Sequence, residues 1–419
     1  MNGRKAMKKY FPSFAIILPT VLVWMMSCEQ ITDPIAKSVK RPLTSQEMSL
    51  VASDNRFGVK IFKSIAAVQN DSNIFISPLS ISMALGMTLN GALAETREAL
   101  EQTLELQGLS QQQINESYQS LIQLLTQLDP AVIFRIANSI WYRQGMPVKQ
   151  SFLDLNRQYF NARIEGLPFD NPTSVDIINQ WVDDQTSGRI KKIIEQIDPN
   201  DLMFLINAIY FKGDWTYKFD KALTQPANFY GPHGSVYPCQ LMHRESEFLY
   251  LQTYDFQAVD LPYGIGDFRM AIFLPFPEKN IDSLIASLTN QQLDQWIKSF
   301  ANREGILEIP KFKMEYKLDL KEVLSALGMG IAFDPAQANF KDIYEGPENA
   351  FISRVLHKSF VQLDEEGTEA AAVTSVTITL TSAGGAFYLR ADRPFFFIIH
   401  DTHSHTILFA GKIVQAEWN

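Results

Sequence analysis

Cysteine is nearly absent from this chain of 419 residues, which has only Cys28 and Cys239. Two cysteines cannot build the disulfide framework of a small secreted scaffold, so packing has to stabilise the fold. Hydrophobic residues make up 46% of the sequence, which is enough for a large core and excludes a disordered chain.

Clustered basic residues are also missing from the body of the chain. The net charge is −9, and it becomes −13 once the first 27 residues, with four basic and no acidic residues, are removed. Nucleic acids and heparin-like polymers bind to dense patches of Lys and Arg. We therefore expect neither of them as a partner.

Short catalytic motifs are absent as well, because the sequence has no G-x-S-x-G, no H-E-x-x-H and no P-loop. Three histidines, His400, His403 and His405, lie close together around Asp401, and these residue types can bind zinc. Residues 401–404, however, are typical of a turn between two strands, in which neighbouring side chains point apart. We predict no enzyme, no cofactor and no metal site.

The N-terminus has the pattern of a targeting segment. Basic residues precede an apolar stretch from residue 11 to 26, which is short for a membrane-spanning helix and contains two prolines. The stretch ends in Met25-Met26-Ser27-Cys28, which is similar to the lipobox of bacterial lipoproteins; an ordinary cleavable signal is the alternative. We expect a signal peptide at 1–27, lipid on Cys28 and a flexible tether at 28–46, and hence a secreted or cell-envelope protein.

The remaining sequence, residues 47–419, is interpreted as a single domain, because no linker interrupts it. Helical spacing of apolar residues dominates its first half, and apolar or alternating strand patterns dominate its second half. This order favours an α+β fold. The expected helices are 45–68, 78–90, 95–106, 112–127, 154–160 and 175–186, and the expected strands are 132–142, 203–211, 248–261, 268–274, 305–310, 355–363, 395–400 and 407–414.

Five ordered segments resemble the signature of the serpin family, over about residues 47 to 415. The resemblance implies a large central, mostly antiparallel sheet, a second and a third sheet, surrounding helices and an exposed reactive-centre loop at about 365–390. The five segments are NIFISPLSIS (73–82), FLINAIYFKGDW (204–215), VDLPY (259–263), the stretch from His357 to Ala372, and RPFF (393–396) together with Gly411-Lys412.

The resemblance also implies a function, suicide inhibition of serine or cysteine endopeptidases. The target protease would cleave the exposed loop and form an acyl-enzyme, and the freed hinge would then insert into the central sheet as a new strand. The main alternative is a non-inhibitory serpin that acts as a binding protein. We expect a monomer that is prone to loop-sheet polymers, since residues 373–380 are uncharged and β-prone.

The hinge sequence is compatible with insertion. In a strand, alternate residues share a face, and the face that begins at Thr368 carries no charge and is small at its leading end. No lone charge therefore has to be buried on that face, which would cost several kcal/mol. The residues that we assign to the hinge are Glu365, Gly367, Thr368, Glu369, Ala370, Ala371 and Ala372.

The usual family interval, counted from Glu365, predicts the scissile bond at Thr381-Ser382. The following segment is slightly long, so the cut can fall anywhere from Leu380 to Ala383. The small residues there suggest an elastase-like or subtilisin-like target, and Leu380 would suit a chymotrypsin-like one. A trypsin-like target is disfavoured, because no basic residue is near.

A polar cluster of Ser77, Ser80, Asn207 and His357 matches the positions beneath the central sheet where the family's sheet opens. These residues would tune insertion; the alternative is that they are ordinary buried groups with satisfied hydrogen bonds. Trp215 matches a position near the top of the opening, and its alternative is a plain core aromatic.

Overall fold

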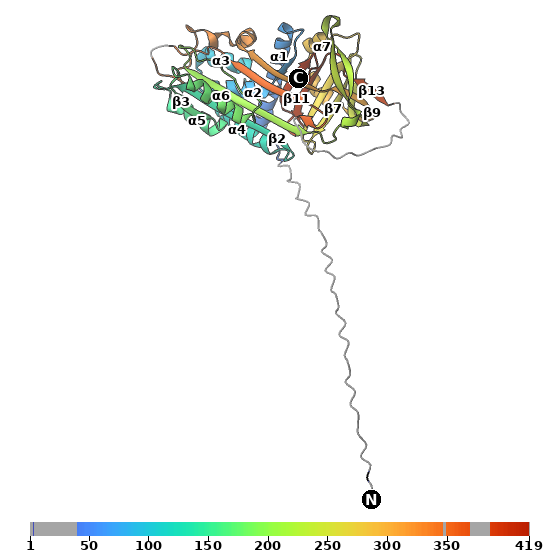
Figure 1. Cartoon of the computed structure of the whole chain (residues 1–419). Helices are drawn as coiled ribbons and strands as arrows, with labels where there is room; N and C mark the ends of the chain where they lie inside the picture. Colours follow the sequence, from blue (N-terminus) through green and yellow to red (C-terminus); the bar gives the residue numbers. More distant parts are fainter. Residues whose placement is uncertain (1–2, 4–39, 347–348, 369–385, 419) are drawn as a thin grey trace. The chain divides into compact units, whose positions relative to one another are not determined.

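The computed structural model describes residues 3, 40–346, 349–368 and 386–418 (Figure 1). Helix α1 (Ser45–Val68) begins at a capping box. The amide of Glu47 donates to the hydroxyl of Thr44 at 3.2 Å, and the amide of Thr44 donates to the carboxylate of Glu47 at 2.7 Å. This pairing satisfies two amides at the helix start. The other helices are α2 (Pro78–Leu89), α3 (Ala94–Thr103), α4 (Gln111–Gln127), α5 (Gln150–Phe160), α6 (Thr173–Gln185), α7 (Ile281–Ser287), α8 (Asn290–Lys298) and α9 (Lys321–Leu324).

A six-stranded sheet forms the centre of the unit that contains residues 37–419. Its strand order is β10-β11-β12-β4-β2-β3, and every pairing is antiparallel except the one between β2 and β3. The strands are β2 (Val132–Arg143), β3 (Arg163–Leu167), β4 (Met203–Asp214), β10 (Phe312–Asp319), β11 (Leu356–Leu363) and the two-residue β12 (Gly367–Thr368).

Within the described residues, the remaining strands form a nine-stranded sheet. The long strand β6 pairs in turn with β5, β9 and β7, so the strands expected in a second and a third sheet are joined into one. The order is β1-β15-β14-β8-β7-β6-β9-β13, with β5 attached to β6. The strands are β1 (Ile74–Ile76), β5 (Gln225–Tyr230), β6 (Val236–Gln252), β7 (Phe256–Tyr263), β8 (Phe268–Pro275), β9 (Ala301–Pro310), β13 (Phe387–Arg390), β14 (Phe395–Asp401) and β15 (Ile407–Ile413).

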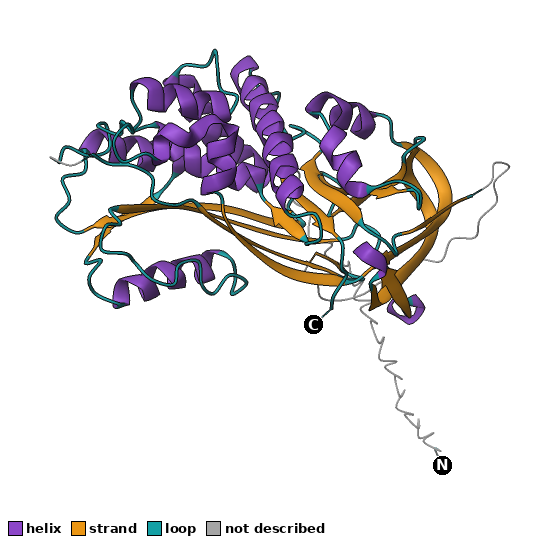
Figure 2. Cartoon of the chain, turned by 90° about the horizontal axis from the view of Figure 1, so that it is seen from above, coloured by secondary structure: helices purple, strands orange, loops and turns teal. Residues whose placement is uncertain are grey.

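Helices cover both faces of the six-stranded sheet (Figure 2). On one face, Phe204 and Ile206 of β4 share a buried cluster with Ile178 and Trp181 of α6. On the other face, Phe211 belongs to the main core, which includes residues of α1, α2 and α4. Because side chains alternate along a strand, both faces of β4 are packed, and its sequence is a nearly continuous apolar run.

The expected α+β architecture is confirmed, and several element boundaries differ from the prediction. The predicted strand 248–261 is wrong: it is the hairpin of β6 and β7. In its turn the hydroxyl of Thr253 accepts from the amides of Asp255 and Phe256 at 3.1 and 3.2 Å. Helix α5 begins at Gln150 rather than at 154, and α3 ends at Thr103 rather than at 106. The strands β1, β3, β5, β10 and β13 and the helices α7, α8 and α9 were not predicted.

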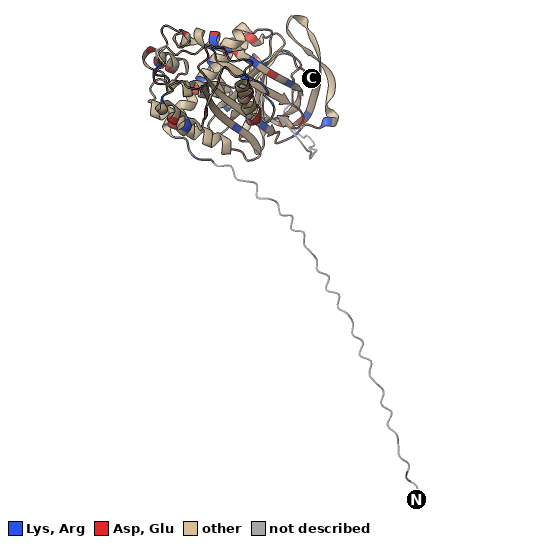
Figure 3. Cartoon of the chain, turned by 60° about the vertical axis from the view of Figure 1, so that its left-hand side comes forward, with Lys and Arg blue, Asp and Glu red and all other residues tan. Residues whose placement is uncertain are grey.

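Among the described residues, no helix is both long and apolar enough to cross a membrane. Basic and acidic residues are interspersed along the chain in Figure 3.

Candidate functional site at the opening of the six-stranded sheet

The strands β4 and β11 are bridged by β12 near one end. Thr368 lies opposite Gly213 of β4 and opposite Leu363 of β11. Within the described part of the chain, β12 is the only strand whose ladders connect β4 with β11. We call the region between β4 and β11 the slot.

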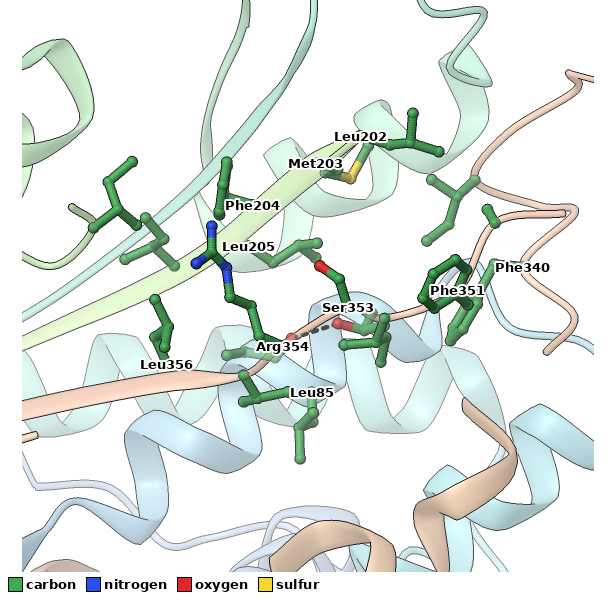
Figure 4. Close-up of a pocket in the computed structure, with 18 of the residues that line it drawn as sticks. Leu85, Leu202, Met203, Phe204, Leu205, Phe340, Phe351, Ser353, Arg354 and Leu356 are labelled. Atoms are coloured by element: carbon green, nitrogen blue, oxygen red, sulfur yellow. Dashed lines mark hydrogen bonds between the residues drawn. The ribbon is translucent and has the colours of Figure 1, made fainter. Parts of the chain in front are cut away.

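Two cavities lie along the slot. A small one, of about 20 Å³, is next to Thr368 and is lined by Ile209 of β4 and Phe360 of β11, among others. A larger one, of about 120 Å³, lies at the far end (Figure 4). It is lined by the start of β4, by one side of α2 and by residues 350–356, which lead into β11. The slot is therefore incompletely filled at both ends.

The hinge residues Gly367 and Thr368 occupy the closed end of the slot. Gly367 has a φ of +149°, and a Cβ atom there would lie 2.2 Å from the carbonyl oxygen of Gly213. Only glycine fits such a close approach in that backbone conformation. Thr368 is 5% exposed, and its hydroxyl lies 2.8 Å from that of Tyr263.

Trp215 contacts the base of the hinge directly. Its backbone amide donates to the carbonyl of Glu366 at 2.7 Å, and its indole N–H donates to the carbonyl of Asp364 at 3.0 Å. Its ring stacks on Tyr263, with centroids 4.3 Å apart. Trp215 is thus a core aromatic that also fixes the backbone on which the hinge begins.

Three lysines hold the two hinge glutamates. Lys311 lies 2.9 Å from the carboxylate of Glu365, and Lys218 and Lys221 lie 2.8 and 2.6 Å from that of Glu366. Burial would raise the pKa of Glu365, but the bond from Lys311 outweighs it and the pKa is lowered. Hydrogen bonds from Lys218 and then Lys221 lower the pKa of Glu366. Both carboxylates are therefore ionised, and ion pairs with the lysines fix their positions.

These lysines were missed by sequence reasoning. Lys218 lies three residues after the family-like segment 204–215, but nothing in the spacing connects it with Glu366, which is far away in the chain. Lys311 follows the end of β9 and carries no motif of its own. Only the folded chain brings these charges together.

The predicted polar cluster is present in two parts. The amide of Ser77 donates to Nε2 of His357 at 3.3 Å, and the amide of Ser80 donates to the hydroxyl of Ser77 at 3.2 Å. Burial lowers the pKa of His357 to about 4, so the ring is neutral. Asn207 is separate from these residues, because its side-chain amide donates to Asn138 at 2.7 Å.

One polar atom of Asn207 is unused. Its side-chain oxygen is buried and has no hydrogen-bond partner among the described residues. A buried acceptor without a partner costs free energy.

The scissile region Leu380, Thr381, Ser382 and Ala383 lies outside the described residues, as do the hinge residues Glu369, Ala370, Ala371 and Ala372. The predicted signal peptide, most of the tether and Cys28 lie outside them as well.

The histidines near the C-terminus are separated in space. Nε2 of His400 lies 3.4 Å from the carboxylate of Asp260, while His403 donates to the carbonyl of Arg41 at 2.7 Å. Among the described residues, no group of three His, Cys, Asp or Glu side chains could hold a metal ion.

Comparison with known proteins identifies the family. Residues 52–416 match the model for serpins (serine protease inhibitors). An uncharacterized serpin-like protein of Thermococcus kodakarensis is 32% identical over 375 residues, which cover 88% of this chain and 86% of the relative.

Solved serpin structures show the same fold. The native state of the thermophilic serpin tengpin is 31% identical and has a TM-score of 0.82, covering 91% of this chain and 97% of that one. The latent state of tengpin has a TM-score of 0.78. Human thyroxine-binding globulin, complexed with thyroxine, is 25% identical with a TM-score of 0.81, covering 89% of this chain and all of its own.

Proposed function

Since the chain belongs to the serpin family, we propose that it is a suicide-type inhibitor of serine endopeptidases, with cysteine endopeptidases as the second target class. The observation that carries this proposal is the position of Thr368, which already pairs with both β4 and β11. Thr368 would thus be the first residue of the inserting strand, and among the described residues no strand lies between β4 and β11 beyond it.

The register of β12 predicts where the following residues would lie after cleavage. Both pairings of Thr368 are antiparallel, so each step forward in the hinge is a step backward in β4 and β11. Continued in this register, Thr374 would lie between Asn207 and His357, and Ile378 between Met203 and Ser353. The segment would therefore fill the slot from the small cavity to the large one.

The side chains fit this register. The hydroxyl of Thr374 would reach the unused oxygen of Asn207 and satisfy it. Ala370 would lie opposite the bulky Phe211, where a small residue is needed. Glu369, the one charged residue of the inserting segment, would lie opposite Lys212, and opposite charges across a ladder are favourable.

The scissile bond is proposed at Thr381-Ser382, within the range Leu380 to Ala383. We would incubate residues 29–419 with elastase, subtilisin and chymotrypsin and analyse the products by denaturing gel and mass spectrometry. A covalent complex with a released peptide that starts near Ser382 is expected. Cleavage by all three without any complex would contradict inhibition of these protease classes.

A non-inhibitory binding role is the alternative. One solved serpin was found complexed with thyroxine, and this chain has a cavity of about 420 Å³ among α1, α8 and the strands β14 and β15. Binding of small apolar ligands that raises the Tm, together with cleavage but no trapping, would favour this role. We propose no catalytic activity, which a turnover assay on peptide and ester substrates tests.

The cellular setting is also a proposal. A signal peptide at residues 1–27, a lipid on Cys28 and a tether at 28–46 would hold a monomeric inhibitor at the cell envelope. Mass spectrometry of the N-terminal peptide from a bacterial membrane fraction would reveal the lipid. An unmodified N-terminus in the medium would indicate ordinary secretion instead.

A further inference from the structure

The segment between α6 and β4 is fastened to the first half of the six-stranded sheet. Arg143, at the end of β2, donates to the carbonyl of Pro199 at 2.7 Å and to that of Asp201 at 2.8 Å. The amide of Arg143 also donates to the carbonyl of Leu202 at 2.9 Å. Asp201 therefore moves with β2 and β4.

The same segment is fastened to the other half of the sheet. Arg354 donates to the Asp201 carboxylate at 2.8 Å and to the carbonyl of Gln196 at 3.1 Å. The hydroxyl of Ser353 donates to the other carboxylate oxygen of Asp201 at 3.1 Å. Ser353 and Arg354 lead directly into β11, and the Asp201 carboxylate is buried.

Arg354 also reaches toward β4 itself. Its guanidinium lies over the ring of Phe204, 5.5 Å from the centroid, and Figure 4 shows it extending across the large cavity toward that strand. The far end of the slot is thus bridged by side chains, on the side opposite to β12.

The contacts of Asp201 with Ser353 and Arg354 cross the gap between β4 and β11, into which the inserted strand would have to enter. In the register derived above, Ile378 would lie between Met203 and Ser353. A strand inserted there holds its two neighbours about 9.5 Å apart. Ser353 now contacts Asp201, two residues before Met203, at 3.1 Å. The 3.1 Å joins two side-chain oxygens, so widening this end of the slot to admit a strand would lengthen and break that hydrogen bond.

We propose that Asp201, Ser353 and Arg354 form a clasp that must open before residues 376–379 insert. The clasp thereby sets the partition between trapping the protease and simple cleavage. This inference rests on the proposed inhibitory function and adds positioning residues to it.

A reversible lock tests the clasp. In the double variant Asp201→Cys/Ser353→Cys, a disulfide would fix the contact, and reduction would release it. Two readouts are needed: covalent complex formation with a cleaving protease, and annealing of a synthetic peptide that copies residues 368–379, followed by the Tm. Under reduction, the variant should trap and anneal. After oxidation, both should fall at least tenfold while the loop is still cleaved at the same bond.

Equal trapping and annealing in the oxidised and reduced forms would overturn the clasp. The peptide readout does not depend on any protease. If wild type forms no covalent complex but oxidation still blocks annealing, the clasp stands and the proposed function fails.

A point variant and a matched control complete the test. Arg354→Gln should accelerate peptide annealing severalfold, because it removes the clasp donor. Lys317→Ala should leave annealing unchanged: Lys317 binds Glu195 of the same segment at 2.7 Å, but both side chains are exposed. Identical rates for Arg354→Gln and wild type would contradict the proposal.

Discussion

The hydroxyl groups of Tyr263 and Thr368 lie 2.8 Å apart and are both buried. This contact connects β7 of the nine-stranded sheet with β12 of the six-stranded sheet. Gly213 completes the site, because a Cβ atom there would lie 3.0 Å from the Tyr263 ring. Thr368 is therefore packed against the Tyr263 ring and the β4 backbone.

Replacing Thr368 with Arg should convert the inhibitor into a substrate. The long cation would have to be buried beside Tyr263 without a partner, which costs several kcal/mol. We expect cleavage at the same bond with at least a tenfold loss of covalent complex, measured by densitometry. Thr368→Ser keeps the hydroxyl and is the control. If Thr368→Arg traps protease as fully as wild type, Thr368 does not begin the inserted strand.

The charge pair between Glu366 and its lysines should make the hinge sensitive to acid. The folded pKa of Glu366 is lowered, so its contribution to stability is present above its ordinary value of 4.5 and is lost as the pH falls through the folded value. Glu366→Gln should lower the Tm by about 2 °C at pH 7, since such partly exposed pairs are weak.

The difference in Tm between Glu366→Gln and wild type should shrink as the pH falls below 4.5. Thermal scans at several pH values check this. A difference that is the same at pH 7 and in acid would show that the amide disturbs packing and not charge.

The sequence motifs predicted the fold, which the structure confirms, for physical reasons that are visible in the residues; the assignments of the site residues stay predictions. The helical spacing of 45–68 agrees with α1, because one apolar face is buried, and the continuous apolar run 203–211 agrees with β4, because both of its faces are packed. The hairpin between β6 and β7 was missed because its turn is Thr253-Tyr254-Asp255, which contains neither Gly nor Pro.

The contacts at the site join residues that are far apart in the sequence, so they form only in the folded chain. Gly367 and Thr368 were assigned to the hinge from the family resemblance, and the structure adds how closely their backbone and side chains are packed. The partners Lys311, Arg354 and Asp201 carry ordinary surface-type side chains, and sequence spacing says nothing about which of them face the slot. Asn207 was grouped with His357, although in this structure a separate amide pair holds it.

Asp54 should make stability fall as the pH rises toward neutrality. It is completely buried, and the Tyr118 hydroxyl donates to one of its oxygens at 3.0 Å. Burial raises the pKa of Asp54 to about 7, so the folded chain holds this proton more tightly than the unfolded chain. The contribution of this group to the free energy of unfolding is fully present below about pH 4. It is lost as the pH rises through 7, by up to about 4 kcal/mol.

Asp54→Asn should therefore raise the free energy of unfolding at pH 8 and change it little at pH 4. Asparagine keeps an acceptor for Tyr118 and cannot ionise. Denaturant unfolding at both pH values measures the effect, and Tyr118→Phe is the control for the lost hydrogen bond. Equal destabilisation by Asp54→Asn at both pH values would mean that the carboxyl group does not titrate in this range.

His357 should make the slot open more easily in mild acid. Its folded pKa of about 4 lies below the ordinary value of 6.5, because burial disfavours the charged ring. Stability from the neutral ring is present above pH 6.5 and is lost as the pH falls toward 4, with about 2 kcal/mol gone at pH 5. Protonation also removes the acceptor that Nε2 offers to the amide of Ser77.

We therefore expect loop-sheet polymers to form at least severalfold faster at pH 5 than at pH 7.5 on mild heating, measured by native gels. His357→Gln retains an acceptor and does not titrate, so its polymerisation rate should vary little over this range. The hinge glutamates cannot account for the effect, since their stabilisation is lost only below pH 4.5. If acid accelerates polymerisation of His357→Gln as much as that of wild type, a group other than His357 controls the opening of the slot. Asn207, with its unused side-chain oxygen, is then the next residue to replace.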